Sequence, residues 1–327
     1  MILVTGATGL LGSAIVESLL KKGEKVRALV RNKSDLKQLK PFEDKVDIVQ
    51  GDVLDMHSLE EATAEVKQIY HCAAIVSFDP NQKDLMHQIN VEGTTNIVNV
   101  ALEKGIEKLL HVSSIAALGR VKNGAIVTES TQWQNTKENS QYAISKYLSE
   151  IEIWRGIAEG LNAVIVNPSI ILGKGNWKND SSALFNIGFQ KIPFYPAGVN
   201  GFVDQNDVVK ASIELMESSI VNERFILSGA DISYKDLFTW MAQNYGHNIP
   251  RYELKNWMGQ LAWRLEKIRT FINGKTPVIT KETIRTTSNK YSYSSQKLKQ
   301  AIGFKFTPAK ETIDRISQLY LEETKTS

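Results

Sequence analysis

A tyrosine and a lysine lie four residues apart in the segment QYAISKY, within a helix predicted over Asn139–Glu159. This spacing places the Tyr142 phenol and the Lys146 ammonium group one helical turn apart on the same face. A positive charge near a phenol favours the phenolate, so Lys146 should lower the pKa of Tyr142. Tyr142 would then be a usable general acid or base for the interconversion of a carbonyl and an alcohol.

A strand predicted over Lys108–Ser114 ends in two hydroxyl side chains, Ser113 and Ser114. We favour Ser114 as the residue that holds the same substrate oxygen as Tyr142. A second Tyr-x-x-x-Lys copy, Tyr293–Lys297, serves as an internal control. It follows no strand that ends in serines and lies far along the chain from the glycine-rich N-terminal segment, so we assign it to chance.

A strand, a glycine-rich turn and a helix open the chain. Ile2–Val4 is a short apolar run, glycines follow at positions 6, 9 and 12, and apolar residues recur at helical spacing over Leu10–Leu20. Gly6 permits a tight turn, Gly9 lets the backbone approach a pyrophosphate, and Gly12 lets the helix pack closely on the strand. The amides and the positive dipole end of the helix favour a phosphate, so this segment predicts a dinucleotide site.

The residues after the next two strands bear on which dinucleotide is bound. A strand over Lys25–Arg31 ends in Arg31, where an NAD site usually has an acidic residue for the ribose 2′-hydroxyl. The guanidinium group suits the 2′-phosphate of NADP, so NADP(H) is favoured and NAD(H) stays possible; the alternative is a solvated basic turn. Asp52 follows a strand over Lys45–Gln50. It could accept a hydrogen bond from the adenine amino group, or it could cap the short helix predicted around His57–Ala62.

Strands and helices alternate through the first half of the chain, with further strands at Lys67–Ala74 and Asn162–Asn167 and a helix at Asn90–Leu102. This alternation predicts an α/β fold, a Rossmann-type doubly wound parallel sheet with a smaller, mainly helical substrate lobe. In such sheets ligands bind at the carboxyl ends of the strands. Residues of interest from six segments fall at that edge: Gly6, Arg31, Asp52, Ala73, Ser114 and Pro168.

The pattern changes after Pro168, where polar loops replace the alternation. We assign residues 1–168 plus 202–228 to the nucleotide-binding domain, and residues 169–201 plus 229–327 to the substrate lobe. Within the lobe, Trp257–Ile272 is amphipathic and basic. It is predicted to pack on the lobe, and a membrane-surface helix is the alternative.

Composition excludes several classes of protein. The formal net charge is +3 and no basic block occurs, so no nucleic-acid partner is expected. No apolar run reaches the roughly 18 residues of a membrane-spanning helix. Cys72 is the only cysteine and no signal peptide is recognised, which favours the cytoplasm. His71 and Cys72 are predicted to pack inside a strand, and we expect no metal, because no His, Cys and carboxylate cluster has ligand spacing.

Together these segments resemble the extended short-chain dehydrogenase/reductase superfamily, of the NAD-dependent epimerase/dehydratase type, over nearly the whole chain. TGATGLLG is similar to the glycine motif and GDVLD to the adenine-side motif, while HCAA resembles the segment after strand four and NVEGTTN the helix that follows it. HVSSIA with YAISK carries the family's Ser-Tyr-Lys triad onto Ser114, Tyr142 and Lys146, and NPSIILG resembles the segment at the nicotinamide end. FVDQNDVV and KYSYSSQKLKQAIGFKFTP resemble further signatures. The implied cofactor-binding residues are Gly6, Thr8, Gly9, Leu10, Leu11, Gly12, Arg31, Asp52, Val53, Ala73, Ala74, Lys146, Asn167, Pro168 and Ser169.

Within the superfamily, Arg31 and the Asn167–Ser169 segment look most like the dihydroflavonol-reductase-like branch. The resemblance implies an NADP(H)-dependent oxidoreductase that interconverts a ketone or aldehyde and an alcohol on a small organic substrate. Tyr142 would transfer the proton, Lys146 would also bind the nicotinamide ribose, and Ser114 would steady the oxygen. The alternatives are a nucleotide-sugar epimerase or dehydratase and a non-catalytic nucleotide-sensing protein, which would have no use for an activated phenol. The family also implies a possible homodimer.

Overall fold

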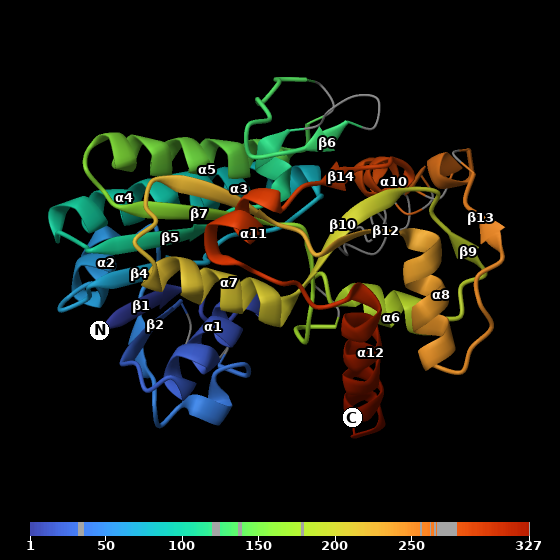
Figure 1. The fold of residues 1–327 in the computed structure, drawn as a ribbon, viewed down its shortest axis with the longest axis horizontal. Helices are drawn as coiled ribbons and strands as arrows, with labels where there is room; N and C mark the ends of the chain where they lie inside the picture. The colour runs from blue at the N-terminus through green and yellow to red at the C-terminus, as the bar shows by residue number, and fades with distance from the viewer. Residues whose placement is uncertain are drawn as a thin grey trace.

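The computed structural model describes residues 1–31, 36–119, 125–136, 139–177, 180–255, 257–261, 263, 264, 266 and 280–326. Its main sheet has seven parallel strands in the order β11-β7-β5-β4-β1-β2-β3 (Figure 1). The strands are β1 (Ile2–Thr5), β2 (Val26–Val30), β3 (Asp47–Gln50), β4 (Gln68–His71), β5 (Lys108–Val112), β7 (Ala163–Pro168) and β11 (Glu223–Leu227). The chain winds outward from β1 to β3 and then returns to β4 on the other side of β1. This reversal confirms the doubly wound Rossmann-type fold and places its crevice beside the ends of β1 and β4.

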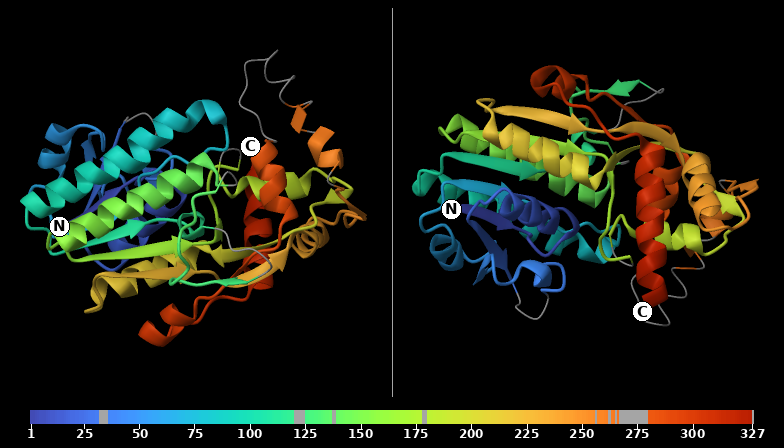
Figure 2. Two further views of the ribbon diagram at one scale, coloured as in Figure 1. Left: turned by 90° about the horizontal axis from the view of Figure 1, so that it is seen from above. Right: turned by 60° about the horizontal axis from the view of Figure 1, so that its bottom comes forward.

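Helices cover both faces of the main sheet (Figure 2). One apolar cluster joins the sheet to α1 (Leu10–Lys21) and α7 (Gln205–Glu217). The other joins it to α2 (Met56–Ala62), α4 (Gly93–Glu103) and α5 (Gln141–Ala158). Neighbouring strand residues face opposite clusters, as Leu3 and Val4 do. Because both faces are buried, the strands read as apolar runs with no polar alternation.

The rest of the chain builds a second body around a three-stranded sheet of β12 (Ala230–Ser233), β10 (Val199–Asp204) and β8 (Ile170–Leu172). Its core lies between α6, α8 and α12, and Figures 1 and 2 show α12 crossing the end of the main sheet. The remaining elements are α3 (Lys83–His87), α6 (Ala183–Phe189), α8 (Tyr234–Asn244), α10 (Lys281–Ser288), α11 (Gln296–Ile302), α12 (Ala309–Thr326), β6 (Ile126–Val127), β9 (Phe194–Tyr195), β13 (Tyr252–Glu253), β14 (Ser292–Tyr293), a π-turn (Gln88–Glu92) and short 3₁₀ turns at Lys40–Phe42, Pro80–Gln82 and Ile115–Leu118.

One segment assigned to the lobe packs elsewhere. Leu298 of α11 and Phe304 after it belong to the apolar cluster on the α1–α7 face of the main sheet. The division into two domains therefore stays a prediction. The segment with Leu298 and Phe304 is an exception to it, because this segment packs on the nucleotide-binding domain. Half of Trp257–Ile272, the segment predicted to pack on the lobe, lies outside the described residues. No helix of the described part of the chain is long and apolar enough to cross a membrane.

Several elements start or stop at residues that the sequence analysis missed. The helix α5 begins at Gln141, two residues later than predicted, because the Ser140 side chain accepts a hydrogen bond from the Ala143 amide and caps it. The helix predicted over Asn90–Leu102 is in fact a π-turn followed by α4. A π-turn inserts one extra residue per turn, and apolar spacing gives no signal for it.

Candidate active site

The turn after β1 forms a cradle that only glycine fits. Gly6 has a φ of +63°, and a Cβ there would lie 2.7 Å from the backbone nitrogen of Ala73 after β4. A Cβ on Gly12 would lie 2.2 Å from the Gly6 carbonyl oxygen. Gly9 precedes α1, and no side chain caps that helix. The first backbone amides of α1 can therefore donate hydrogen bonds to a ligand. The cradle fits a diphosphate group at the helix N-terminus.

Gln205 ties this turn to the second body of the chain. Its side-chain nitrogen donates to the Leu10 carbonyl at 2.6 Å, and its side-chain oxygen accepts from the Lys174 amide at 3.0 Å. Gly173 packs directly against this side chain, since a Cβ there would lie 2.2 Å from Oε1. Gln205 was not among the predicted site residues, although it lies in the FVDQNDVV segment, which resembles a family signature, and begins α7.

The residues expected near the adenosine half lie at the ends of β2 and β3. Arg31 is exposed directly after β2, and Asp52 follows β3. The alternative role of Asp52 as a helix cap is wrong: Asp55 caps α2 by accepting from the His57 amide at 3.1 Å. Asp52 instead accepts from the amide of Leu54, two residues on, at 3.0 Å. This side chain therefore closes a local turn beside the proposed adenine position.

His71 is the last residue of β4, and Cys72, which was predicted inside the strand, follows it and packs half-buried against the core. His71 is fully buried between the Thr5 and Thr94 hydroxyls, at 2.8 and 3.0 Å. Burial, and secondarily the charge of Lys146, lowers the pKa of His71 to about 3. Burial raises the pKa of the Cys72 thiol to about 12. A neutral imidazole and a protonated thiol at neutral pH agree with the predicted packing roles.

Ser114 and Tyr142 meet at the carboxyl edge of the sheet. β5 ends at Val112, so Ser114 lies beyond the strand, where its hydroxyl caps a 3₁₀ turn and also bonds the Tyr142 phenol. Ser113 is buried and its hydroxyl has no hydrogen-bond partner among the described residues. Ser114 is therefore the serine whose hydroxyl pairs with the Tyr142 phenol, as the sequence analysis favoured. Phe78 packs edge-on against the Tyr142 ring, with centroids 6.2 Å apart.

The electrostatics at this pair differ from the expectation that Lys146 lowers the pKa of Tyr142. Burial raises the pKa of Tyr142, and the hydrogen bond from Ser114 offsets part of that increase. The Lys146 ammonium is 1% exposed and donates to the Val112 carbonyl at 2.7 Å. Burial lowers the pKa of Lys146 to about 8, against the opposing charge of Glu150. The prediction considered only the helical spacing between Tyr142 and Lys146 and was wrong because the Tyr142 phenol is buried. Burial removes the water that would solvate a phenolate, so the charged form is disfavoured and the pKa rises.

Asn90 of the π-turn supports the helix turn that carries Tyr142, and sequence analysis missed it. Its side chain accepts from the Ile75 amide at 2.7 Å and donates to the Ile75 carbonyl at 2.9 Å. It also donates to the Ser145 hydroxyl at 2.9 Å, which in turn donates to the Tyr142 carbonyl at 2.9 Å. The NVEGTTN segment was noted for its helical spacing and its family resemblance, and the asparagine that opens it was the available signal.

The end of β7 completes the edge. Asn167 is fully buried, and its side-chain nitrogen donates to the Ser114 carbonyl at 3.0 Å and to Glu150 Oε1 at 2.5 Å. The side-chain oxygen of Asn167 and the hydroxyl of Ser169 are buried without a hydrogen-bond partner in the described structure. Buried polar atoms without partners are rare, so these two are available to a polar ligand at this edge. Within the described ranges, no group of three His, Cys or acidic side chains is placed to hold a metal ion.

Comparison with known proteins agrees with this arrangement. The model of the NAD dependent epimerase/dehydratase family matches residues 2–224. The chain is 29% identical over 309 residues to sterol demethylase protein B of Methylococcus capsulatus, covering 92% of each chain. It is 28% identical to a putative dihydroflavonol 4-reductase of Synechocystis sp., covering 95% of this chain and 91% of that protein. It is also 28% identical to cinnamoyl-CoA reductase 1 of Petunia hybrida, covering 96% and 90%.

Solved structures give the same fold. The crystal structure of gox2253 has a TM-score of 0.82 and 29% identity, covering 99% of this chain and 98% of that one. UDP-glucose 4-epimerase of Thermotoga maritima has a TM-score of 0.80 and covers 99% of both chains; at 18% identity it supports the fold alone. The reductase names among the relatives, with the family match, make this chain an NAD(P)-dependent oxidoreductase. It belongs to the NAD-dependent epimerase/dehydratase family, as its sequence motifs predicted.

Proposed function

We propose that this oxidoreductase uses NADP(H) to interconvert a ketone or aldehyde and an alcohol on a small organic substrate, in the manner of the dihydroflavonol-reductase-like branch. The observation that carries the proposal is the Ser114–Tyr142 hydrogen bond beside buried Lys146, at the sheet edge where the Gly6–Gly12 cradle opens. A phenol placed there can exchange a proton with a carbonyl or alcohol oxygen.

Each residue of this trio has a role that follows from its surroundings. The raised pKa of Tyr142 keeps the phenol protonated at neutral pH, ready to donate a proton to a carbonyl oxygen. The Ser114 hydroxyl, already paired with that phenol, would hold the same oxygen. Lys146 is a cation at neutral pH with its ammonium fixed by the Val112 carbonyl, and we assign it to the nicotinamide ribose.

The dinucleotide would be held by residues that follow five strands, together with Lys146 of α5, and would supply or accept the hydride when bound. The diphosphate is assigned to the turn and helix start after β1, the adenosine half to the segments after β2 and β3, and the nicotinamide half to the segments after β4 and β7. The residues concerned are Gly6, Thr8, Gly9, Leu10, Leu11, Gly12, Arg31, Asp52, Val53, Ala73, Ala74, Lys146, Asn167, Pro168 and Ser169. Arg31 supports NADP over NAD, because an exposed guanidinium at the end of β2 suits a 2′-phosphate.

The printed names of the relatives guide the choice of substrate. One is named for a sterol and another for a dihydroflavonol, so we propose an apolar ring ketone as the substrate class. A nucleotide-sugar epimerase or dehydratase is less well supported, since the epimerase resemblance is one of fold at 18% identity. A cytoplasmic location and a homodimer remain part of the proposal, the first because Cys72 is the only cysteine.

Replacement of the phenol tests the proposal. Tyr142→Phe should lower turnover of an apolar ring ketone by about 100-fold or more, the contribution of a positioned general acid, while NADPH binding followed by nicotinamide fluorescence survives. The matched control is Tyr293→Phe in the second Tyr-x-x-x-Lys copy, on β14, which should turn over at the wild-type rate. Unchanged turnover of Tyr142→Phe would refute the assignment, and absence of binding to both NADPH and NADH would refute the function.

A further inference from the structure

A buried carboxylate lies one helical turn after Lys146 on α5. Glu150 is 1% exposed, accepts from Asn167 Nδ2 at 2.5 Å through Oε1, and faces Arg224 Nη1 at 3.3 Å through Oε2. Burying a carboxylate costs several kcal/mol unless it is paired and hydrogen-bonded on both sides. Both oxygens of Glu150 meet that condition.

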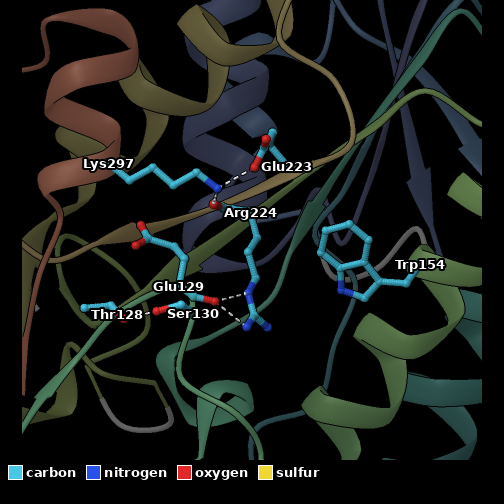
Figure 3. Close-up of a pocket in the computed structure, with 7 residues that line it drawn as sticks. All are labelled: Thr128, Glu129, Ser130, Trp154, Glu223, Arg224 and Lys297. Atoms are coloured by element: carbon cyan, nitrogen blue, oxygen red, sulfur yellow. Dashed lines mark hydrogen bonds and ion pairs between the residues drawn. The ribbon is translucent and has the colours of Figure 1, made fainter.

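Arg224 is itself fixed in place on the far side of Glu150. Its guanidinium donates to the Glu129 carbonyl from Nε at 2.9 Å and from Nη2 at 2.5 Å, and to the Thr131 carbonyl at 3.4 Å. Figure 3 shows this guanidinium directed at Glu129 in a pocket that Trp154 and Lys297 also line. Lys297 is paired with Glu223 there, so Arg224 is the cation that faces Glu150.

Glu150 reaches two of the three proposed catalytic residues. Through Asn167 it is linked to the backbone of Ser114, because the same Asn167 nitrogen donates to the Ser114 carbonyl at 3.0 Å. Through space its charge acts on the ammonium of Lys146, which lies four residues earlier on the same helix. One buried charge is thus coupled both to the strand edge and to the cation.

The other titratable groups that act on Lys146 are uncharged at neutral pH. They come from β4, from the residue after it and from β5: His71, Cys72 and His111. The pKa of His71 lies at about 3 and that of His111 well below its usual range, both through burial, and the pKa of the Cys72 thiol is about 12. Among these described groups, Glu150 therefore supplies the negative charge that favours the ammonium.

We propose that Glu150 is a positioning residue of the active site: its carboxylate lies one helical turn from Lys146 and acts on that ammonium, and its bond to Asn167 holds the Ser114 backbone in place. The proposal rests on the function assigned above to Ser114 and Lys146. Arg224 pairs with the carboxylate from the opposite side.

The charge and the hydrogen bond can be separated by substitution. Glu150→Gln keeps the shape and an oxygen acceptor for Asn167 but removes the charge. Titration of Lys146, followed by NMR of protein with ¹³C at lysine Cε and assigned with Lys146→Met, should show an apparent pKa lowered by about one unit or more. Asn167→Ala should leave that titration in place, since it keeps the Glu150 charge. The matched control is Glu152→Gln, which removes a partly exposed charge paired with Arg155 on the same helix and should shift nothing.

Activity gives the second measurement. In Glu150→Gln the alkaline limb of the kcat/KM profile for ketone reduction should move to lower pH by the shift seen in the NMR titration, whereas Asn167→Ala should lower kcat without moving the limb. An unchanged Lys146 titration in folded Glu150→Gln would overturn the proposal, even if the wild type is a reductase. A lowered Lys146 pKa in Glu150→Gln, together with a wild-type chain that reduces no ketone, would instead uphold the charge coupling and refute the proposed function.

Discussion

Gly12→Ala tests whether the cradle after β1 is built for a ligand. The new Cβ would lie 2.2 Å from the Gly6 oxygen, 2.8 Å from its carbon and 3.0 Å from Ala7 Cα. All three atoms are backbone, so no side chain can move aside, and Gly6 already lies against the chain after β4. Overpacking of this kind costs about 1–3 kcal/mol. Alanine is up to about 1 kcal/mol more favourable than glycine within a helix such as α1, and this gain offsets part of the cost. The loss in the free energy of unfolding should therefore be small.

Cofactor affinity should therefore reveal the clash better than stability. If the turn opens to relieve it, the cost is carried by the amides that hold the diphosphate, and 1–3 kcal/mol corresponds to a loss of NADPH affinity of about 5- to 150-fold. The measurement is fluorescence titration with NADPH beside chemical denaturation. The control is Gly23→Ala: Gly23 has a φ of +83° and nothing within 4 Å of an added Cβ, so alanine there costs about 1–2 kcal/mol of stability and leaves affinity unchanged. An NADPH affinity of Gly12→Ala within about twofold of wild type would refute the reasoning.

Two further predictions concern charge. Arg31→Ala should weaken NADPH binding by about tenfold and leave NADH binding unchanged. A hydrogen bond to a charged group contributes about 1.5–3 kcal/mol when buried and less at this exposed site. An equal loss of affinity for both dinucleotides would count against a 2′-phosphate contact. The pKa of Lys146 is lowered from 10.5 to about 8, so across that window the unfolded chain keeps a proton that the folded chain releases, and the contribution of Lys146 to stability rises with pH. The free energy of unfolding of wild type relative to Lys146→Met should increase by up to about 3 kcal/mol from pH 8 to 10.5 in denaturant titrations; a flat difference would contradict the buried ammonium.

The parts of the site that sequence could predict depend on local backbone requirements. Gly6, Gly9 and Gly12 could be assigned because a strand, a tight turn and a helix follow one another within a dozen residues. Tyr142 and Lys146 could be paired because helical spacing fixes which side chains share a face. The doubly wound sheet followed from buried apolar strands that alternate with helices. None of these inferences needs to know what packs against the element.

The features that were predicted wrongly depend on contacts that the local sequence does not determine. Asp52 and Asp55 are both short acidic residues before α2, and only the turn that Asp52 closes on Leu54 leaves the cap to Asp55. The pKa of Tyr142 depends on burial by surrounding segments, which helical spacing does not report. The packing of Leu298 and Phe304 against the main sheet likewise depends on the position of the short helix α11, which the local sequence does not determine.

The missed residues have one physical property in common: each is a polar side chain whose partners come from distant segments. Asn90 joins Ile75 to Ser145, while Gln205 joins Leu10 to Lys174. Such bonds rigidify a site only when every buried polar group is satisfied, so their positions are set by the completed fold.

The protonation state of Tyr142 determines which direction of the reaction is favoured. A protonated Tyr142 held by Ser114, with the Lys146 ammonium fixed on the Val112 carbonyl, is arranged to donate a proton, which favours carbonyl reduction at neutral pH. Alcohol oxidation would require the phenolate, and therefore a higher pH.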